Sequence, residues 1–238
     1  MVLILPDDER LSGDGLYSGV STGIDDFKPA IAPSRVRQQL CADQIRNELI
    51  MSPKVTASSS TTKSARRIKI IDQLLDVMKS DDIFRTLDYR HKKESYIKQY
   101  MHQPLKARLI EIHRSLSPKT SEDTLKRKAR ESLDWEGDKQ TTINHTRFLG
   151  VQHRPDFRVR IDGLKIAVEV KRGENGQAVR EGIGQSLVYV ASDDYDFIIY
   201  IFIDTSKDKK IRESIGRELE VVFVNSLWDR FNVRFAVV

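Results

Sequence analysis

The sequence is poor in cysteine and has no long apolar segment. Its 238 residues include a single cysteine, Cys41, which cannot form a disulfide within the chain and is expected to be a buried, inert thiol. The longest apolar run, residues 197–203, has seven residues, whereas a helix needs about 20 to span a bilayer. Residues 1–5 are followed at once by Pro6 and three acidic residues, unlike a secretory signal. We therefore expect no membrane association, no export and a cytoplasmic location.

The chain also lacks a nucleotide-binding loop and a strong excess of one charge. The region around Gly13 and Gly15 has no Gly-Lys-Ser/Thr ending, and no such loop occurs elsewhere, which excludes an ATP-driven motor encoded in this chain. The net charge is only +5, from 40 basic and 35 acidic residues. Residues 63–130, however, contain 18 basic and 9 acidic residues. A basic segment of this kind favours a nucleic-acid partner.

Composition divides the chain into three regions. Residues 1–64 are expected to form an N-terminal arm, a helix over 34–51 and a linker, because seven of the nine residues 56–64 are Ser or Thr. Residues 65–118 are expected to form a basic helical region, and residues 119–238 an α/β domain that begins near Pro118. Apolar spacing and turn residues predict helices over 65–80, 82–101, 105–116, 122–136, 176–191, 209–219 and 225–230, and strands over 141–150, 157–161, 164–170, 197–204 and 233–238. Strands joined by both tight turns and helices indicate an α/β fold with a mixed sheet.

A hairpin within residues 156–171 is the most informative local feature. Asp162-Gly163 lies between two alternating runs, as in a two-residue type I′ turn. If Ile161 pairs with Leu164, Asp156 lies directly across from Glu169. One face of the hairpin is then apolar, and the other carries both carboxylates together with Lys171.

Two carboxylates opposite one another in a sheet repel each other. A divalent cation reverses this, because Mg²⁺ prefers oxygen ligands close together and leaves room for water and phosphate oxygens. Lys171, two residues further along the same face, is placed to orient or deprotonate a water, or to offset negative charge at a reacting phosphate. The pattern therefore favours metal-dependent chemistry on phosphate.

The order Pro155-Asp156, twelve residues, Glu169-Val170-Lys171 resembles the PD-(D/E)XK nuclease superfamily. Gln185 and Tyr189 in the next predicted helix are similar to the Q-x-x-x-Y element of its RecB-like branch. The resemblance covers residues 120–205. It implies a restriction-endonuclease-like mixed sheet flanked by helices, with Asp156, Glu169, Lys171 and Gln185 as catalytic residues and Asp156 and Glu169 as ligands of Mg²⁺, for which Mn²⁺ can substitute.

A third acidic ligand often comes from the helix before the sheet in families of this type. On a helix over residues 122–136, Glu122 and Glu136 lie on the same face as Leu125. Glu122 is the third metal ligand that we favour, and Glu136 is the alternative. Glu122 is equally well explained as a first-turn acid that the helix dipole stabilises, and Glu136 as a solvated helix end.

Several cationic and aromatic side chains are candidate DNA contacts. Residues 89–100 interleave tyrosines with cations, a pattern suited to phosphate contact and base stacking, although a solvated helix face explains it equally well. The nucleic-acid-binding residues that we expect are Arg90, Lys92, Lys93, Arg158, Arg160 and Tyr189.

Together these features predict a Mg²⁺-dependent nuclease that hydrolyses phosphodiester bonds in DNA. A restriction or defence endonuclease is favoured over a recombination or repair nuclease, because the helical N-terminal region is suited to target recognition. The alternatives are a non-catalytic DNA-binding protein that retains the nuclease fold, and a structural subunit of a nuclease encoded by another chain. DNA is the expected partner, and a homodimer is left open.

Overall fold

A computed structural model describes residues 63–80, 83–84, 89–139 and 141–238. All of these belong to one compact unit, Thr56–Val238. The predicted N-terminal arm, the helix over 34–51 and Cys41 lie outside the described residues. Among the helices that the structure describes, none combines the length and apolar character needed to cross a membrane.

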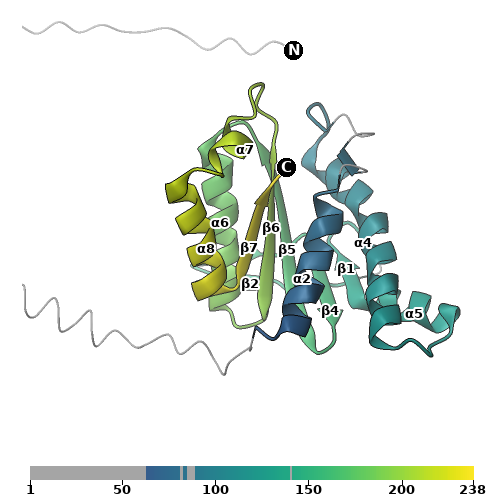
Figure 1. Ribbon diagram of the computed structural model, residues 1–238. Coiled ribbons are helices and arrows are strands. Elements are labelled where there is room, and N and C mark those ends of the chain that lie inside the picture. Colours follow the sequence, from purple (N-terminus) through teal and green to yellow (C-terminus); the bar gives the residue numbers. More distant parts are fainter. Residues whose placement is uncertain (1–62, 81–82, 85–88, 140) are drawn as a thin grey trace, which may run out of the picture. The chain divides into compact units, whose positions relative to one another are not determined.

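A five-stranded mixed sheet forms the centre of the fold (Figure 1). Its strands, in spatial order, are β1 (Leu133–Trp135), β4 (Phe157–Ile161), β5 (Leu164–Gly173), β6 (Phe197–Asp204) and β7 (Val233–Val237). The β1–β4 and β4–β5 pairs are antiparallel, whereas β5, β6 and β7 run parallel. Parallel neighbours require crossover connections, which helices supply here. The predicted α/β class with a mixed sheet is therefore confirmed.

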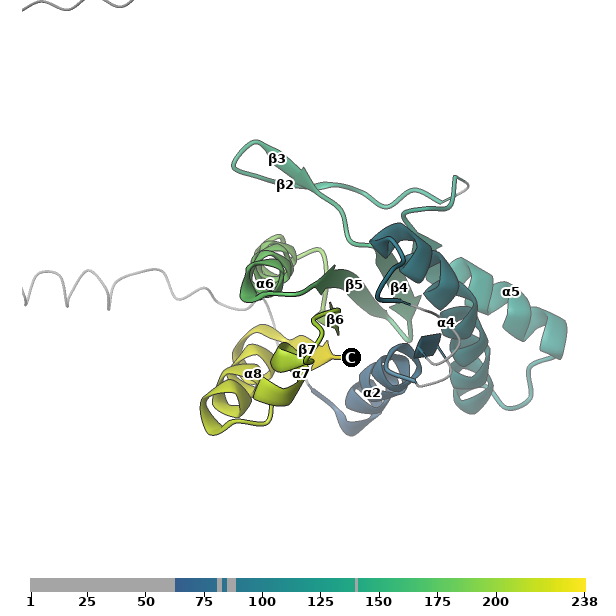
Figure 2. The same ribbon diagram turned by 90° about the horizontal axis from the view of Figure 1, so that it is seen from above.

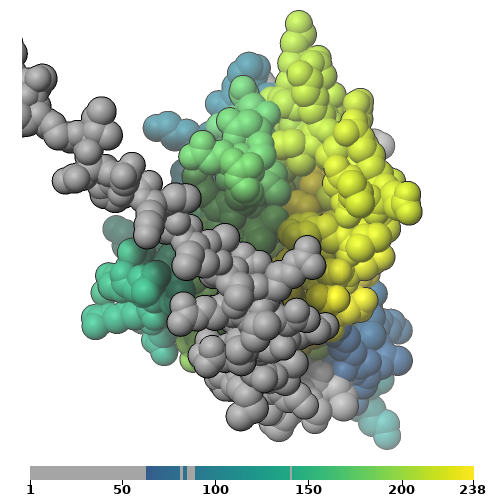
Figure 3. All heavy atoms as spheres, turned by 90° about the vertical axis from the view of Figure 1, so that its left-hand side faces the viewer, coloured from purple at the N-terminus to yellow at the C-terminus, as the bar shows by residue number. Residues whose placement is uncertain are grey.

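Helices cover both faces of the sheet, as the view from above shows (Figure 2). One face packs against α2 (Ala65–Met78) and α4 (Glu94–Leu116), with α5 (Glu122–Ser132) beside α4. The other face packs against the two crossover helices, α6 (Gly176–Ala191) and α8 (Glu218–Phe231). Helix α6 connects β5 to β6, and α8, preceded by the short helix α7 (Lys210–Ser214), connects β6 to β7. Figure 3 shows the outer surface of this second layer, with α6 in green and α7 and α8 in yellow.

The helical region before Pro118 shares its core with the sheet. Buried residues of α2 and α4, such as Leu74 and Met101, belong to the same apolar cluster as Val159 and Val168 of the β4–β5 hairpin. The structure therefore shows no break between cores at Pro118, where the sequence suggested a domain boundary. This continuous core positions α4 beside the strands that carry the predicted site.

Two predicted helix boundaries are wrong. The expected interruption at Pro104 is absent, because α4 runs through it. A proline inside a helix removes one hydrogen bond, but burial of Met101 and Leu105 on either side outweighs this loss. The helix predicted over 122–136 ends at Ser132, since Leu133–Trp135 pairs with β4 as a strand. Glu136 consequently lies in the turn after β1.

Four further segments differ from their predicted boundaries. The strand predicted over 141–150 is a separate hairpin, β2 (Thr146–Phe148) and β3 (Val151–His153), which extends from the body of the protein (Figure 2). Residues 89–93, predicted to be helical, form turns before α4. The helices predicted over 209–219 and 225–230 are instead the short α7 and the longer α8.

Candidate active site

The β4–β5 hairpin forms with the predicted register. Ile161 pairs with Leu164 and Phe157 with Val168, and both turn residues, Asp162 and Gly163, have positive φ (53° and 74°). Asp156 immediately precedes β4 and lies outside the paired residues, so the predicted pairing of Asp156 with Glu169 is not part of the strand ladder. All seven predicted apolar-face residues are buried in one cluster: Phe157, Val159, Ile161, Leu164, Ile166, Val168 and Val170.

Asp156 and Glu169 are both buried at the opposite face, with 2% and 1% of their surfaces exposed. A hydrogen bond ties the Asp156 side chain to β5, because the backbone N–H of Val170, the residue after Glu169, donates to Asp156 Oδ2 at 2.7 Å. Glu169 is held centrally in the sheet, where it pairs in register with Tyr200 of β6. The hairpin therefore brings the two predicted metal ligands together.

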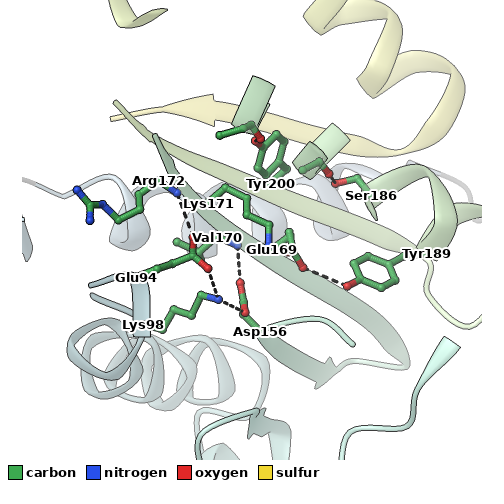
Figure 4. A network of polar contacts seen from close by, with 12 residues as sticks. Glu94, Lys98, Asp156, Glu169, Val170, Lys171, Arg172, Ser186, Tyr189 and Tyr200 are labelled. Carbon is green, nitrogen blue, oxygen red and sulfur yellow. Dashed lines mark hydrogen bonds and ion pairs between the residues drawn. The ribbon is translucent and has the colours of Figure 1, made fainter. Parts of the chain in front are cut away.

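Two lysines neutralise these carboxylates (Figure 4). Lys171 Nζ lies 2.9 Å from Glu169 Oε1, as expected for neighbours on one strand face. Lys98 Nζ forms an ion pair with Asp156 Oδ1, and it lies 2.6 Å from Glu94 Oε1 on the same helix. The Tyr189 hydroxyl donates to Glu169 Oε2 at 3.1 Å. Each of the four carboxylate oxygens thus has a protein donor.

Burial dominates the electrostatics of the pair. It raises the pKa of Asp156, and the negative charge of Glu169 raises it further, against the opposing effect of Lys98. Burial also raises the pKa of Glu169, which Lys171 opposes. Burial lowers the pKa of Lys171, but the charge and hydrogen bond of Glu169 outweigh it, so the pKa lies above its usual value. Lys171 is therefore an ammonium, suited to stabilising negative charge rather than to removing a proton.

Glu136, not Glu122, is the acidic residue near Asp156. The backbone N–H of Glu136 donates to the carbonyl of Asp156 at 2.9 Å, while its side chain binds Arg154 at 2.5 Å. Glu122 instead binds Arg114 at 2.8 Å, and it is exposed at the start of α5. Arg114 lies sixteen residues along α4 from Lys98, or about 24 Å at 1.5 Å per residue. The structure does not bring Glu122 to the site.

Glu94 and Lys98 are site residues that the sequence reasoning did not identify. Both come from α4, and Glu94 is fixed by a second contact, since its Oε2 accepts a hydrogen bond from the backbone N–H of Arg172 at 3.2 Å. In the sequence they form only a Glu–Lys pair four residues apart, which is common on exposed helix faces. An acidic residue of α4, not of α5, therefore lies beside the cluster, where it contacts Lys98 and the backbone N–H of Arg172.

Gln185 and Tyr189 lie one turn apart on α6. Tyr189 is fully buried and its hydroxyl donates to Glu169, so it faces the carboxylate cluster and is not placed for the DNA contact that we expected. Within the part of the chain that the structure describes, the buried Gln185 Oε1 has no hydrogen-bond partner. The predicted Q-x-x-x-Y pair thus connects to the carboxylate cluster through its tyrosine.

The predicted DNA-binding cations fall into two groups. Arg90, Lys92 and Lys93 are exposed in the turn before α4, and this turn is tied to β5 because Arg172 Nη2 donates to the carbonyl of Arg90 at 2.8 Å. Lys92 and Lys93 also line a hollow of about 540 Å³ that includes Tyr96 and Trp135. The turn that carries these cations is therefore linked to Arg172, the residue that follows Lys171.

Arg158 and Arg160 form the second group, and both are engaged within the protein. Their Nη2 atoms lie 2.7 Å and 3.2 Å from Asp134 Oδ2 on β1, and Arg158 Nη2 also donates to the carbonyl of Thr142. A carboxylate that is almost buried partly neutralises them. Their free charge is lower than the sequence alone suggested.

The donor set suits a hard cation such as Mg²⁺, because the cluster presents carboxylate oxygens and no sulfur or imidazole ligand. Asp156 and Glu169 are the residues that would hold it, with Glu136 and Glu94 nearby. Across the described ranges, no group of three or more His, Cys, Asp or Glu residues is arranged so that it could hold a metal ion.

No protein-family model matches this sequence, and no curated protein or solved structure matches it either. The fold and the site alone define a class: an α/β protein whose mixed sheet carries a buried cluster of two carboxylates and two lysines.

Proposed function

We propose that the chain is a Mg²⁺-dependent nuclease that hydrolyses phosphodiester bonds in DNA. The observation that carries the proposal is the burial of Asp156 and Glu169 side by side at the sheet face, with the Lys171 ammonium 2.9 Å from Glu169. Burying two interacting carboxylates is costly, and raised pKa values of both groups express this cost. A divalent cation bound between the two carboxylates would offset this energetic cost and would allow the cluster to act on a phosphate group.

The residues have distinct roles in this proposal. A divalent cation held by Asp156 and Glu169 would polarise a phosphate oxygen and promote ionisation of a water. The water oxygen forms a bond to phosphorus, the ester oxygen leaves, and the proton lost by the water is available to that oxygen. Lys171 stabilises the negative charge that develops on the phosphate oxygens, and Tyr189 positions Glu169.

Exposed cations support DNA as the substrate. Arg90, Lys92 and Lys93 lie in a turn bonded to Arg172, the residue after Lys171. Cations at such a position attract a phosphate backbone without reading its sequence. A restriction or defence role, with a recombination or repair role as the alternative, stays a prediction from the sequence, as does a homodimer.

One observation favours a second candidate, a DNA-binding protein without catalytic activity. Lys98 and Lys171 already neutralise Asp156 and Glu169, so the cluster is electrically balanced without any added cation. A site of this kind also serves as a purely structural ion-pair network. The two candidates differ in whether a divalent cation is needed.

The test uses the full chain with supercoiled plasmid, linear duplex and single-stranded DNA, in Mg²⁺, Mn²⁺ or EDTA. Cleavage should require the cation, and Asp156→Asn or Glu169→Gln should reduce its rate at least about a hundredfold. Asp72→Asn is the matched control, because it alters an acid–arginine ion pair between α2 and β7 outside the site. Equal cleavage in EDTA, or full activity of Glu169→Gln, would refute the metal mechanism. DNA binding without cleavage under any condition would leave the non-catalytic candidate.

A further inference from the structure

Lys98 lies where a cation bound to Asp156 would lie. Its side chain is 12% exposed, and its ammonium is held between Asp156 Oδ1 and Glu94 Oε1 (Figure 4). The other oxygen of Asp156 accepts the Val170 N–H. Lys98 therefore occupies the one Asp156 oxygen that a backbone group does not already fix.

A divalent cation and the Lys98 ammonium compete for this position. Like charges at contact distance repel strongly in a site shielded from water. Lys171 on β5 does not compete for this oxygen, because its ammonium contacts Glu169 and not Asp156. A cation that binds Asp156 must therefore displace Lys98 from Oδ1.

Glu94 provides a second partner for the displaced ammonium. It lies one helical turn before Lys98, and the backbone N–H of Arg172 fixes its other oxygen. A small rotation of the lysine side chain can break the contact with Asp156 while the contact with Glu94 persists. The movement leaves no unpaired charge in the site.

We propose that Lys98 is an internal competitor of the divalent cation: it binds Asp156 until a cation arrives and is then retained by Glu94. Lys98 thereby weakens cation binding and keeps the buried carboxylates neutralised at low cation concentration. The inference rests on the proposed function, because it assumes that Asp156 is a cation ligand.

The test measures Mn²⁺ binding to the full chain without DNA, by the loss of the free-ion signal in electron paramagnetic resonance. Lys98→Met removes the ammonium and should tighten binding about tenfold or more, the scale of one charge-assisted hydrogen bond. Lys98→Arg keeps the charge, but a guanidinium can donate two hydrogen bonds to Asp156, so this variant should bind Mn²⁺ more weakly than the wild type. Lys106→Met, on α4 but outside these contacts, is the control and should bind as the wild type does.

The arginine variant separates competition from a general field effect. If only net charge mattered, Lys98→Arg would match the wild type, and that result would overturn the proposal. Equal affinity of Lys98→Met and the wild type would also overturn it, while leaving the metal site intact. If neither protein bound Mn²⁺ at millimolar concentration, the proposed metal site itself would fail.

A second measurement follows the wild-type protein itself and uses a variant only to assign one resonance. The side-chain ¹⁵N resonance of Lys98, assigned from its absence in Lys98→Met or Lys98→Arg, should shift when Mg²⁺ is added. The resonance of Lys106 should stay constant. A Lys98 resonance that does not move at saturating Mg²⁺ would contradict displacement.

Discussion

Replacement of Tyr189 by Phe removes one hydroxyl from a fully buried position and leaves the ring in place. The hydroxyl donates to Glu169 Oε2 at 3.1 Å, whereas Lys171 contacts the other carboxylate oxygen, Oε1. A hydrogen bond to a charged group contributes about 1.5–3 kcal/mol, and one to a neutral group about 0.5–1.5 kcal/mol. The loss of stability should therefore depend on whether Glu169 is ionised.

The pH dependence has a definite sign. Burial raises the pKa of Glu169 in the folded protein, so the folded state retains a proton that the unfolded chain releases, and stability falls as pH rises through this range. The Tyr189 hydroxyl favours the ionised carboxylate and reduces that fall. Tyr189→Phe should therefore cost about 1 kcal/mol below the pH range in which Glu169 ionises and about 2–3 kcal/mol above that range.

Urea unfolding in EDTA, repeated across this pH range, measures the effect. Tyr200→Phe is a matched control: Tyr200 is also buried, but its hydroxyl contacts the carbonyls of Ala178 and Val179 at 3.3 Å. Its loss should be about 0.5–1.5 kcal/mol and independent of pH. If Tyr189→Phe behaved like this control, or left stability unchanged, Tyr189 would not stabilise an ionised Glu169.

Three other outcomes are expected. Burial and the charge of Glu169 raise the pKa of Asp156, so wild-type urea midpoints in EDTA should fall as pH rises, and Asp156→Asn should flatten this trend. Pro104→Ala should raise the free energy of unfolding by about 1–3 kcal/mol, because it restores an N–H inside α4; an unchanged calorimetric midpoint would contradict this. Replacing Arg90, Lys92 and Lys93 by Ala should lower the salt slope of DNA binding by about one per phosphate contact, and an unchanged slope would show that they face bulk solvent.

The hairpin and its register were predictable because they depend on local rules. A turn that needs two positive φ angles specifies Asp162-Gly163, and the alternation of side chains then sets which residue faces which. Asp156 and Glu169 are thirteen residues apart, with a tight turn between them. Their proximity therefore followed from the sequence of the hairpin alone.

The contribution of α4 was not predictable in this way. Lys98 is 58 residues before Asp156, and their contact depends on how α4 packs against the sheet. The choice of Glu122 failed for a related reason: the helical geometry was extended to residue 136, although pairing with β4 ends the helix at Ser132. Strand pairing is a tertiary interaction, which outweighs the local helical pattern.

The long-range contacts also change the role of the basic helical region. A detachable DNA-binding module would leave the site complete without it. Instead, α4 supplies the counter-charge of Asp156, and its buried residues Met101 and Leu105 complete the core under β4 and β5. Without α4, Asp156 would be a buried carboxylate beside Glu169 with no lysine of its own, which is strongly unfavourable. The cations that precede α4 are consequently tied to the same framework as the carboxylates, so under the proposed function a DNA strand bound by that turn would be held at a fixed position relative to the site.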